Sequence, residues 1–280
     1  MGMQINTNLA ANNTYRNLAS TQTDMAKSLE RLSSGLRINR AADDAAGLAI
    51  SEGLKSQVGG LTVASRNAQD AVSVIQVAEG SLSEVQTILQ RVRDLAVQAG
   101  NGSNNAESRG AIATEVTALG KELTRISEST NFNGIKLLDA GAVAADLTFQ
   151  IGAGGDADAD QIAVKLTNVA AIGEAVSGLA AAGFANSAAA IATINTIDGH
   201  IVDVSESRAS LGADQNRFES VIRNLAVSKE NLTAAGSRIR DTDMASEMVA
   251  YTRSSILSQA GTAMLAQANQ SNQGVLTLLR

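Results

Sequence analysis

The stretch that decides the fold runs from Leu54 to Ala99 and reads LKSQVGGLTVASRNAQDAVSVIQVAEGSLSEVQTILQRVRDLAVQA. Apolar residues recur in it every seven positions, at Leu54, Leu61, Ala68, Ile75, Leu82, Leu89 and Ala96. Small or branched residues stand three positions further on, at Ala64, Ala71, Ala78, Val85, Val92 and Ala99. A repeat of seven keeps one stripe of a helix against a partner helix. The stretch therefore predicts a long helix with one buried seam.

A second ladder of the same period and length lies in the other half of the chain. Its members are Ile197, Val204, Leu211, Phe218, Leu225, Leu232 and Ile239. Because the two ladders match in length, they can pair along their whole extent. A further helical face carries Ile112, Val116, Leu119, Leu123 and Ile126, and it can pack back along the first ladder as a hairpin.

Residues 135–190 have a different character. Leu147, Phe149 and Ile151 alternate with polar residues, and Ile162, Val164 and Leu166 do so after a Gly/Asp loop, which indicates a two-stranded β-hairpin. The segment is acidic, and we expect it to be exposed. The predicted fold class is mainly α: a long antiparallel helical hairpin or coiled-coil bundle with a small β-hairpin insert.

Amphipathic segments also flank the two ladders. The first reads in heptad register as Asn8, Ala11, Tyr15, Leu18, Gln22, Met25, Leu29 and Leu32, and Ser33-Ser34-Gly35 breaks or caps it. The last carries apolar pairs seven apart at Val249/Ala250, Ile256/Leu257 and Ala263/Met264. A helix with one apolar stripe is marginal without a partner. We therefore expect these ends to bury their stripes against other copies of the chain.

The end stripes thus supply a predicted self-assembly surface. Its residues are Ile5, Leu9, Leu18, Met25, Leu29, Leu32, Val249, Ile256, Leu257, Met264, Leu276 and Leu279. Contacts between unlike surfaces that do not close into a ring give helical filaments.

Composition excludes several kinds of chemistry. The chain has no cysteine and no proline, and aromatic residues make up 2%. It shows no cleavable secretory signal, no apolar run long enough to span a membrane and no basic patch for nucleic acid. His200 is the only histidine, and we interpret it as a helix-surface residue. We expect no enzyme activity, no cofactor and no metal.

One acidic triplet imitates a calcium loop. Asp156, Asp158 and Asp160 have the D-x-D-x-D opening, but Gln161 replaces the glycine and Thr167 the glutamate that such a loop requires. We interpret the triplet as a solvated loop.

Particular motifs carry a resemblance to a family. They are Ile5-Asn6-Thr7-Asn8, residues 30–39 (ERLSSGLRIN), residues 43–47 (DDAAG), residues 64–68 (ASRNA), Asn131-Phe132-Asn133-Gly134, Gln215-Asn216-Arg217-Phe218, Ser237-Arg238-Ile239, residues 259–270 (QAGTAMLAQANQ) and Leu278-Leu279-Arg280. On these motifs the chain resembles bacterial flagellin from end to end, as a short form without the large variable central domains.

The resemblance implies an inner assembly domain and an outer bundle domain. Residues 1–44 and 237–280 would form the inner helical domain, and residues 45–134 and 191–236 the outer bundle. Residues 135–190 would be the exposed hairpin insert. The implied protein is a secreted subunit of the extracellular filament, which leaves through the flagellar type III export apparatus with a secretion chaperone and adds beneath a filament cap protein.

The resemblance also implies recognition by the flagellin-sensing Toll-like receptor of hosts. The segment from Gln90 to Val97 is similar to the one that engages this innate immune receptor, and the implied contacts are Gln90, Arg91, Asp94, Leu95 and Glu115. Asp94 stands where the family commonly has glutamate, so recognition would be weakened. We expect Arg91 and Leu95 to face outward.

Two other functions fit parts of the pattern. A protein that joins hook to filament shares the terminal motifs, although the dense C-terminal match favours flagellin. A signalling module built as a long helical hairpin, as in chemoreceptor cytoplasmic domains, has Ala-rich heptads but requires a membrane anchor and does not predict the β insert.

Overall fold

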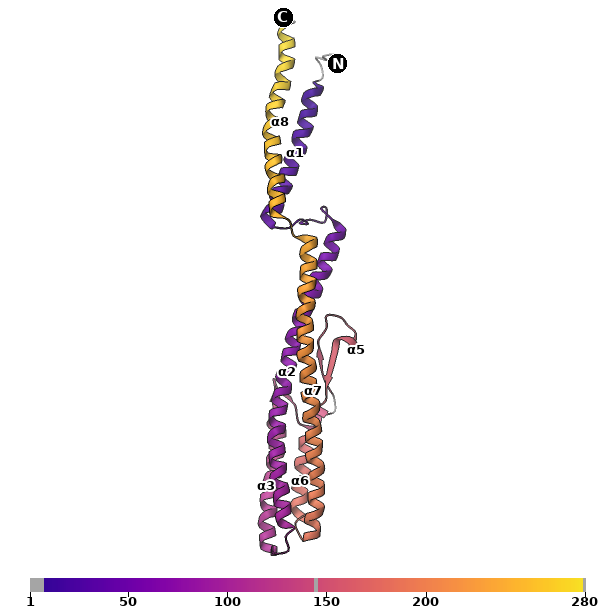
Figure 1. Cartoon of the computed structure of the whole chain (residues 1–280), viewed down its shortest axis with the longest axis vertical. Coiled ribbons are helices and arrows are strands. Elements are labelled where there is room, and N and C mark those ends of the chain that lie inside the picture. Colours follow the sequence, from indigo (N-terminus) through magenta and orange to yellow (C-terminus); the bar gives the residue numbers. More distant parts are fainter. Residues whose placement is uncertain (1–7, 144–145, 279–280) are drawn as a thin grey trace. The chain divides into compact units, whose positions relative to one another are not determined.

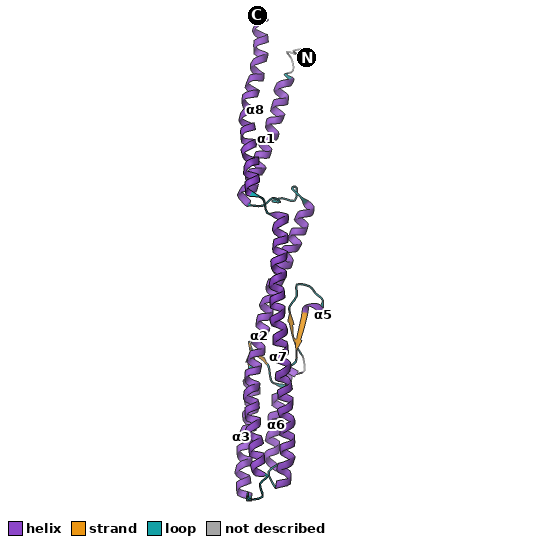
Figure 2. Cartoon of the chain, viewed as in Figure 1, coloured by secondary structure: helices purple, strands orange, loops and turns teal. Residues whose placement is uncertain are grey.

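The computed structural model describes residues 8–143 and 146–278. The helices are α1 (Leu9–Ser34), α2 (Ala45–Ala99), α3 (Ala106–Ser129), α4 (Ala140–Val143), α5 (Ala157–Asp160), α6 (Val169–Ala182), α7 (Ser187–Arg240) and α8 (Met244–Leu278) (Figures 1 and 2). The strands form two antiparallel pairs: β1 (Asn131–Phe132) with β2 (Ile135–Lys136), and β3 (Leu147–Gln150) with β4 (Gln161–Val164). The predicted fold class is confirmed.

The chain divides into two compact units. Unit 1 comprises Met1–Gln57 and Asn231–Arg280, and unit 2 comprises Val58–Glu230. Of the boundaries that we inferred from the sequence, 44/45 coincides with the start of α2, whereas 236/237 lies inside the last turns of α7. The structural division falls inside α2 and α7, because both helices contribute to both units.

The core of unit 2 lies between the two heptad ladders. Ala68, Ile75, Leu82, Leu89 and Ala96 of α2 are fully buried, and so are Ile197, Val204, Leu211 and Phe218 of α7. Two ion pairs show the direction of pairing: Arg93 Nε lies 2.6 Å from Asp198 Oδ1, and Arg208 Nη2 lies 3.4 Å from Glu79 Oε1. Residue numbers on α7 rise as those on α2 fall, so the helices are antiparallel.

Helices α3 and α6 complete the bundle of unit 2 (Figure 1). A Cβ added at Gly173 of α6 would lie 2.9 Å from the backbone nitrogen of Thr124 and 3.0 Å from the carbonyl oxygen of Gly120, both on α3. The two helices therefore meet at their glycines. Helix α6 corrects our expectation that residues 135–190 form an exposed insert, because Val169, Ile172 and Val176 lie in the core.

The predicted β-hairpin is present, and its register pairs Leu147 with Val164 and Phe149 with Ile162. One of its faces is covered. The rings of Phe149 and Phe218 of α7 meet edge to face with centroids 5.7 Å apart, and Asn67 Nδ2 of α2 donates to the carbonyl oxygen of Gln150 (3.0 Å). Alternate side chains of the hairpin thus cover apolar residues of the long helices, since strand side chains alternate between faces.

In unit 1, α1 packs against α8. Asn8 caps α1, and its Nδ2 donates to the carbonyl oxygen of Ala268 (3.0 Å), while Arg31 Nη1 lies 3.6 Å from Glu247 Oε2 near the other end of α1. The pair is therefore antiparallel. Within the described residues, no helix combines the length and the apolar character that crossing a bilayer requires.

Candidate assembly and recognition surfaces

Helix α8 carries apolar side chains on the side that does not contact α1. These side chains are between 47% and 62% exposed: Met244, Met248, Val249, Ile256, Leu257 and Met264. Several of them line a shallow groove of about 420 Å³ together with Thr252 and Arg253. We call this set of six residues the α8 stripe. Large apolar residues that gather on one side of a helix mark an interaction surface rather than ordinary surface scatter.

Helix α1 divides the predicted assembly residues between two sides. Leu18, Met25 and Leu32 are half-buried, and Leu18 lies against Gly261 of α8. Leu9 and Leu29 are 64% and 55% exposed. Ile5, Leu279 and the side chain of Leu276 lie outside the described residues.

One of the two heptad positions that we predicted for the buried face of α1 is wrong. Tyr15 and Leu29 belong to the register inferred from the sequence, yet both are more than half exposed. Thr14, Thr21 and Ser28 take the inward positions instead, and Ser28 is buried. Small residues face α8 because the two helices approach closely, which leaves the larger ones outside.

The link between α1 and α2 is tied to the link between α7 and α8. Gly35 ends α1 in the left-handed region (φ 72°), as the Ser-Ser-Gly sequence predicts. Leu36 and Asp241 form an antiparallel bridge, in which the Arg37 amide donates to the carbonyl oxygen of Arg240 (2.6 Å) and the Thr242 amide to that of Gly35 (3.0 Å). We call residues 35–37 and 239–242 the joint.

Two adjacent carboxylates shape the chain between the joint and α2. Asp43 Oδ2 accepts from the amides of Arg40 (2.9 Å) and Asn39 (3.2 Å), and these bonds lower the pKa of Asp43. Asp44 Oδ1 accepts from the Gly47 amide (2.9 Å) at the start of α2. The Asp-Asp pair thus satisfies amides before and inside the helix, as expected of carboxylates at an N-terminus.

The residues predicted for receptor contact lie on α2 and α3. Arg91 donates through Nη2 (2.7 Å) and Nε (3.0 Å) to Glu115 Oε1, so the structure brings two of the predicted residues together. Gln90, Arg91, Asp94 and Glu115 are exposed. Leu95 is 2% exposed, which corrects our expectation that it faces outward. It packs in the core because α3 covers that side of α2, which the two heptad ladders do not reveal.

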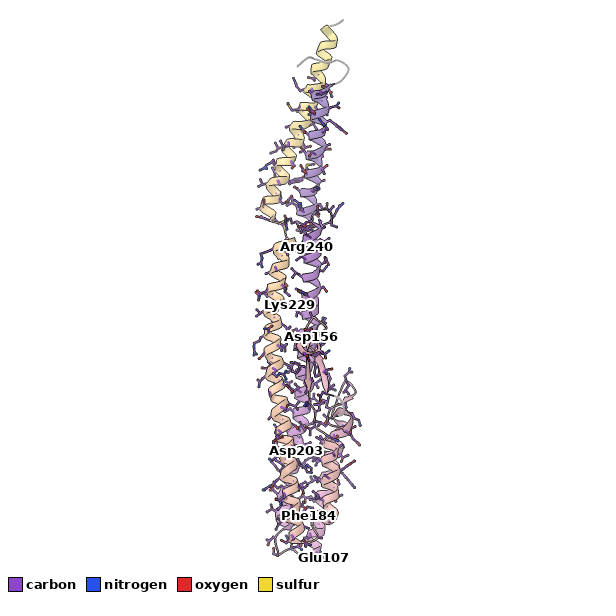
Figure 3. The ribbon with its side chains drawn as sticks, turned by 90° about the vertical axis from the view of Figure 1, so that its right-hand side faces the viewer. Glu107, Asp156, Phe184, Asp203, Lys229 and Arg240 are labelled. Atoms are coloured by element: carbon purple, nitrogen blue, oxygen red, sulfur yellow. The ribbon has the colours of Figure 1, made fainter. Side chains whose placement is uncertain are left out.

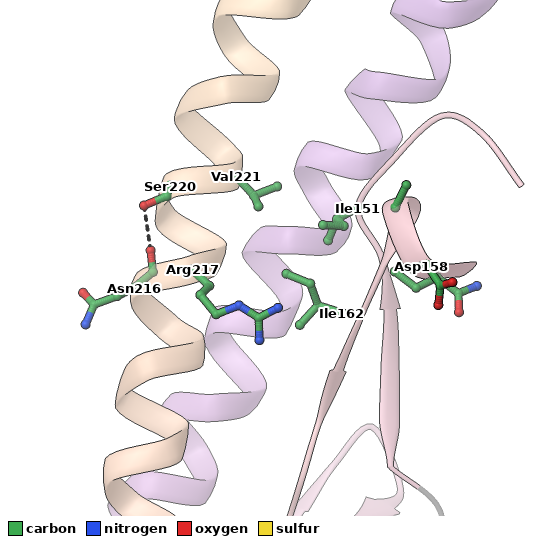
Figure 4. Close-up of a pocket in the computed structure, with 9 residues that line it drawn as sticks. Ile151, Asp158, Ile162, Asn216, Arg217, Ser220 and Val221 are labelled. Carbon is green, nitrogen blue, oxygen red and sulfur yellow. Dashed lines mark hydrogen bonds between the residues drawn. The ribbon is translucent and has the colours of Figure 1, made fainter. Parts of the chain in front are cut away.

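An open groove of about 500 Å³ lies between the hairpin and α7 (Figure 4). Ile151, Ile162 and Val221 supply its apolar lining. Two of its polar side chains already have partners, since Arg217 Nη1 lies 2.8 Å from Asp214 Oδ1 and Ser220 Oγ donates to the carbonyl oxygen of Asn216 (2.9 Å). The groove therefore presents no cluster of free catalytic groups.

The titratable residues noted in the sequence have local structural contacts. The side chain of His200 is 21% exposed, and its Nδ1 lies 3.9 Å from Asp203 Oδ2 one turn away. Asp156 Oδ1 accepts from the Asp158 amide and begins the short helix α5 (Figure 3). Across the described ranges, no three His, Cys, Asp or Glu side chains gather as a metal site would require.

Comparisons with known proteins identify the family of the chain. The model of the bacterial flagellin N-terminal helical region matches residues 5–142, and that of the C-terminal helical region matches residues 194–279. The flagellin of Bacillus subtilis is 49% identical over 99% of this chain and 100% of that protein. The chain belongs to the bacterial flagellin family. The flagellar filament 33 kDa core protein of Treponema phagedenis is 45% identical, with the same coverage of both chains.

A flagellar hook-associated protein from Vibrio parahaemolyticus shares the fold of this flagellin family member. The TM-score is 0.57 with 14% identity, over 71% of this chain and 100% of that one. The likeness at this identity concerns fold alone, whereas the full-length identity to flagellins places the chain among them. As a flagellin, the chain is a structural subunit of the bacterial flagellar filament, outside the cell.

Proposed function

We propose that copies of this chain build the flagellar filament by burying the α8 stripe, together with Leu9 and Leu29 of α1, against neighbouring copies. The single observation that carries this proposal is the row of large apolar side chains that are 47–62% exposed along α8. Leu18, Met25 and Leu32 contribute to assembly indirectly, because they pack α1 against α8. Ile5, Leu276 and Leu279 are included in the proposal on their sequence alone.

Burial of this stripe supplies the driving force. Full burial of one Val, Leu, Ile or Met side chain contributes about 1.5–3 kcal/mol. The stripe of one copy meets a different surface of the next, and contacts of that kind continue as a helical polymer unless they close. The protein therefore acts as a structural element without catalysis.

Seeded polymerisation tests the assembly surface. Ile256→Ser should raise the critical concentration for filament growth by about tenfold or more, since it removes most of one side chain's apolar burial. Val227→Ser is the matched control, because Val227 is 58% exposed against 61% for Ile256 but lies in unit 2. Equal critical concentrations for the two variants would contradict the proposal.

We propose in addition that the exposed face around Arg91 is recognised by the flagellin-sensing innate immune receptor of hosts. Arg91 and Glu115 support it, because their ion pair holds two charged side chains at the surface from two helices. Leu95 contributes by packing behind this face. Asp94 is one methylene shorter than the glutamate that the family commonly has, so we expect weakened recognition.

A receptor-reporter assay in host cells tests this second surface. Arg91→Ala should lower the response several-fold at equal protein concentration, because it removes the group that also positions Glu115. Arg125→Ala is the control, since Arg125 makes a similar exposed ion pair with Glu122 on α3 (2.6 Å). A response unchanged by Arg91→Ala would contradict the proposal.

Assembly outside the cell requires further partners. We propose that the flagellar export apparatus transports the chain unfolded, that a secretion chaperone covers the α8 stripe beforehand and that the cap protein guides its addition to the filament. The absence of proline and cysteine supports passage in an unfolded state, because no prolyl isomerisation or disulfide exchange delays refolding. Co-purification of the chaperone with the wild-type chain, but not with Ile256→Ser, would test the role of the stripe.

A further inference from the structure

The joint of unit 1 (residues 35–37 and 239–242) has no part in the proposed assembly surface. Its two segments are more than 200 residues apart in the sequence. They are hydrogen-bonded to each other through backbone groups and through the Arg37 side chain. The inference below rests on the proposed function, because the register of α1 on α8 matters only if these helices present a surface to other copies.

The seam between α1 and α8 fixes that register only in part. Its inward positions include small residues, Ala11, Thr14, Thr21 and Ser28 on α1 and Ser254, Ser258, Gly261 and Ala268 on α8, beside the larger Leu18, Met25 and Leu32 of α1 and Tyr251 and Leu265 of α8. In coiled coils, large apolar knobs and buried polar groups select one register over its neighbours. Leu18 packs against Gly261, and a shift of one turn, about 5.4 Å, toward Ser258 would again set it against a small residue, whereas a shift toward Leu265 would not.

The joint adds a backbone constraint to the Asn8–Ala268 hydrogen bond and the Arg31–Glu247 ion pair between the two helices. Two backbone hydrogen bonds pair residues 35–37 with residues 240–242, directly where α1 ends and before α8 begins. A slip of α1 along α8 would have to break both. Helix α1 leaves the joint at Gly35, whose φ of 72° lies in the left-handed region that favours glycine, so the direction of departure is also set.

Arg37 adds a side-chain bond to this pairing. Its Nη2 donates to the carbonyl oxygen of Ile239 (2.7 Å), in the last turn of α7. A cation there meets unpaired carbonyl groups and the negative end of the helix dipole. The adjacent residue Arg240 (labelled in Figure 3) also connects the end of α7 to α2, because its Nη1 lies 3.0 Å from Glu52 Oε1.

We infer that Arg37 is a positioning residue that sets the register of α1 on α8 and thereby the shape of the surface that neighbouring copies bury. It does so through Ile239 and the joint rather than by touching another copy. Loss of its guanidinium leaves both helices intact and lets the pair populate slipped registers.

Disulfide trapping measures the register directly, and the chain offers a clean background because it has no cysteine. A Cβ added at Gly261 lies 3.8 Å from Leu18 Cβ, which matches the separation found in disulfides. The reporter chain therefore carries Leu18→Cys and Gly261→Cys. Two slipped reporters combine Leu18→Cys with Ser258→Cys or with Leu265→Cys, which lie about one turn to either side on the half-buried face of α8.

Arg37→Ala should raise disulfide formation in a slipped reporter roughly fivefold, the effect of one hydrogen bond on an equilibrium, and should lower it in the native-register reporter by a smaller factor, because the native register stays the major population. Arg37→Lys, which keeps a donor and a charge, should restore most of the native rate. The matched control is Arg16→Ala, because Arg16 is exposed on α1 and bonds only to Asn13 among the contacts described for it.

Two outcomes would overturn the inference. In one, Arg37→Ala and Arg16→Ala give equal rates in every reporter. In the other, Arg37→Ala slows native and slipped reporters alike, which would mean that Arg37 holds the helices together without setting their register. Circular dichroism of each variant confirms that helix content is retained. Trapping is measured on dilute monomer, so its result is independent of whether the filament proposal holds.

Discussion

At the scale of single residues, Asp43 links local hydrogen bonds to pH. The Arg40 amide, and after it the Asn39 amide, lower the pKa of this carboxyl below its ordinary value of 3.8. A carboxylate whose pKa is lower in the folded state stabilises that state above the unfolded pKa, and the stabilisation disappears as the pH falls through the folded pKa. We expect protection of these amides from hydrogen exchange to decline below about pH 4. Asp43→Asn should remove that pH dependence, and an unchanged acid transition in the variant would contradict this assignment.

Two glycines of α2 should respond oppositely to the same substitution. A Cβ at Gly47 would lie 2.5 Å from Asp44 Oδ2 and 2.7 Å from Ile38 Cδ1, whereas Gly53 has open space around it. Gly47→Ala should destabilise unit 1 by about 1–3 kcal/mol through overpacking. Gly53→Ala should stabilise it by about 0.5–1 kcal/mol, because alanine loses less backbone entropy in a helix. Denaturant unfolding checks both, and a stabilising Gly47→Ala would contradict the packing around Ile38.

At the scale of elements, the contact between α3 and α6 depends on glycine. Alanine at Gly173 would meet backbone atoms of Thr124 and Gly120, so the helices would have to separate. Gly173→Ala should therefore cost about 1–3 kcal/mol of unit 2 stability. Gly178→Ala on the same helix is the control, because nothing lies within 4 Å of its added Cβ. Similar thermal unfolding of the two variants would refute close packing at this point.

Elements also differ in how well sequence patterns reveal them. The heptad ladders of α2 and α7 and the alternation of β3 and β4 were predictable, because each buries a single periodic stripe. Helix α6 was not, since its Ala-rich sequence hides the Val169, Ile172 and Val176 stripe among other apolar residues. Leu95 was misassigned because a second helix, α3, covers α2 on that side.

At the scale of the whole molecule, the bundle core and the proposed assembly surface belong to different units. Unit 2 has its own core, and the α8 stripe belongs to unit 1. Deletion of residues 245–280 should abolish polymerisation, because it removes the stripe and the partner of α1. It should leave the thermal transition of unit 2 within a few degrees of the wild type, as scanning calorimetry would show. Normal polymerisation of the truncated chain would contradict the assembly proposal.

The sequence alone determined the helical class, the two matched seams, the presence of the β-hairpin and the family, because periodic burial and dense motifs are properties of local sequence. Only the tertiary structure decided which residues of α1 face α8 and which remain outside. Tyr15 and Leu29 are apolar enough to be buried, but close approach of the two helices places the small residues Thr14, Thr21 and Ser28 inward instead. The joint likewise became visible only in three dimensions, since backbone hydrogen bonds between distant segments leave no periodic signal in the chain.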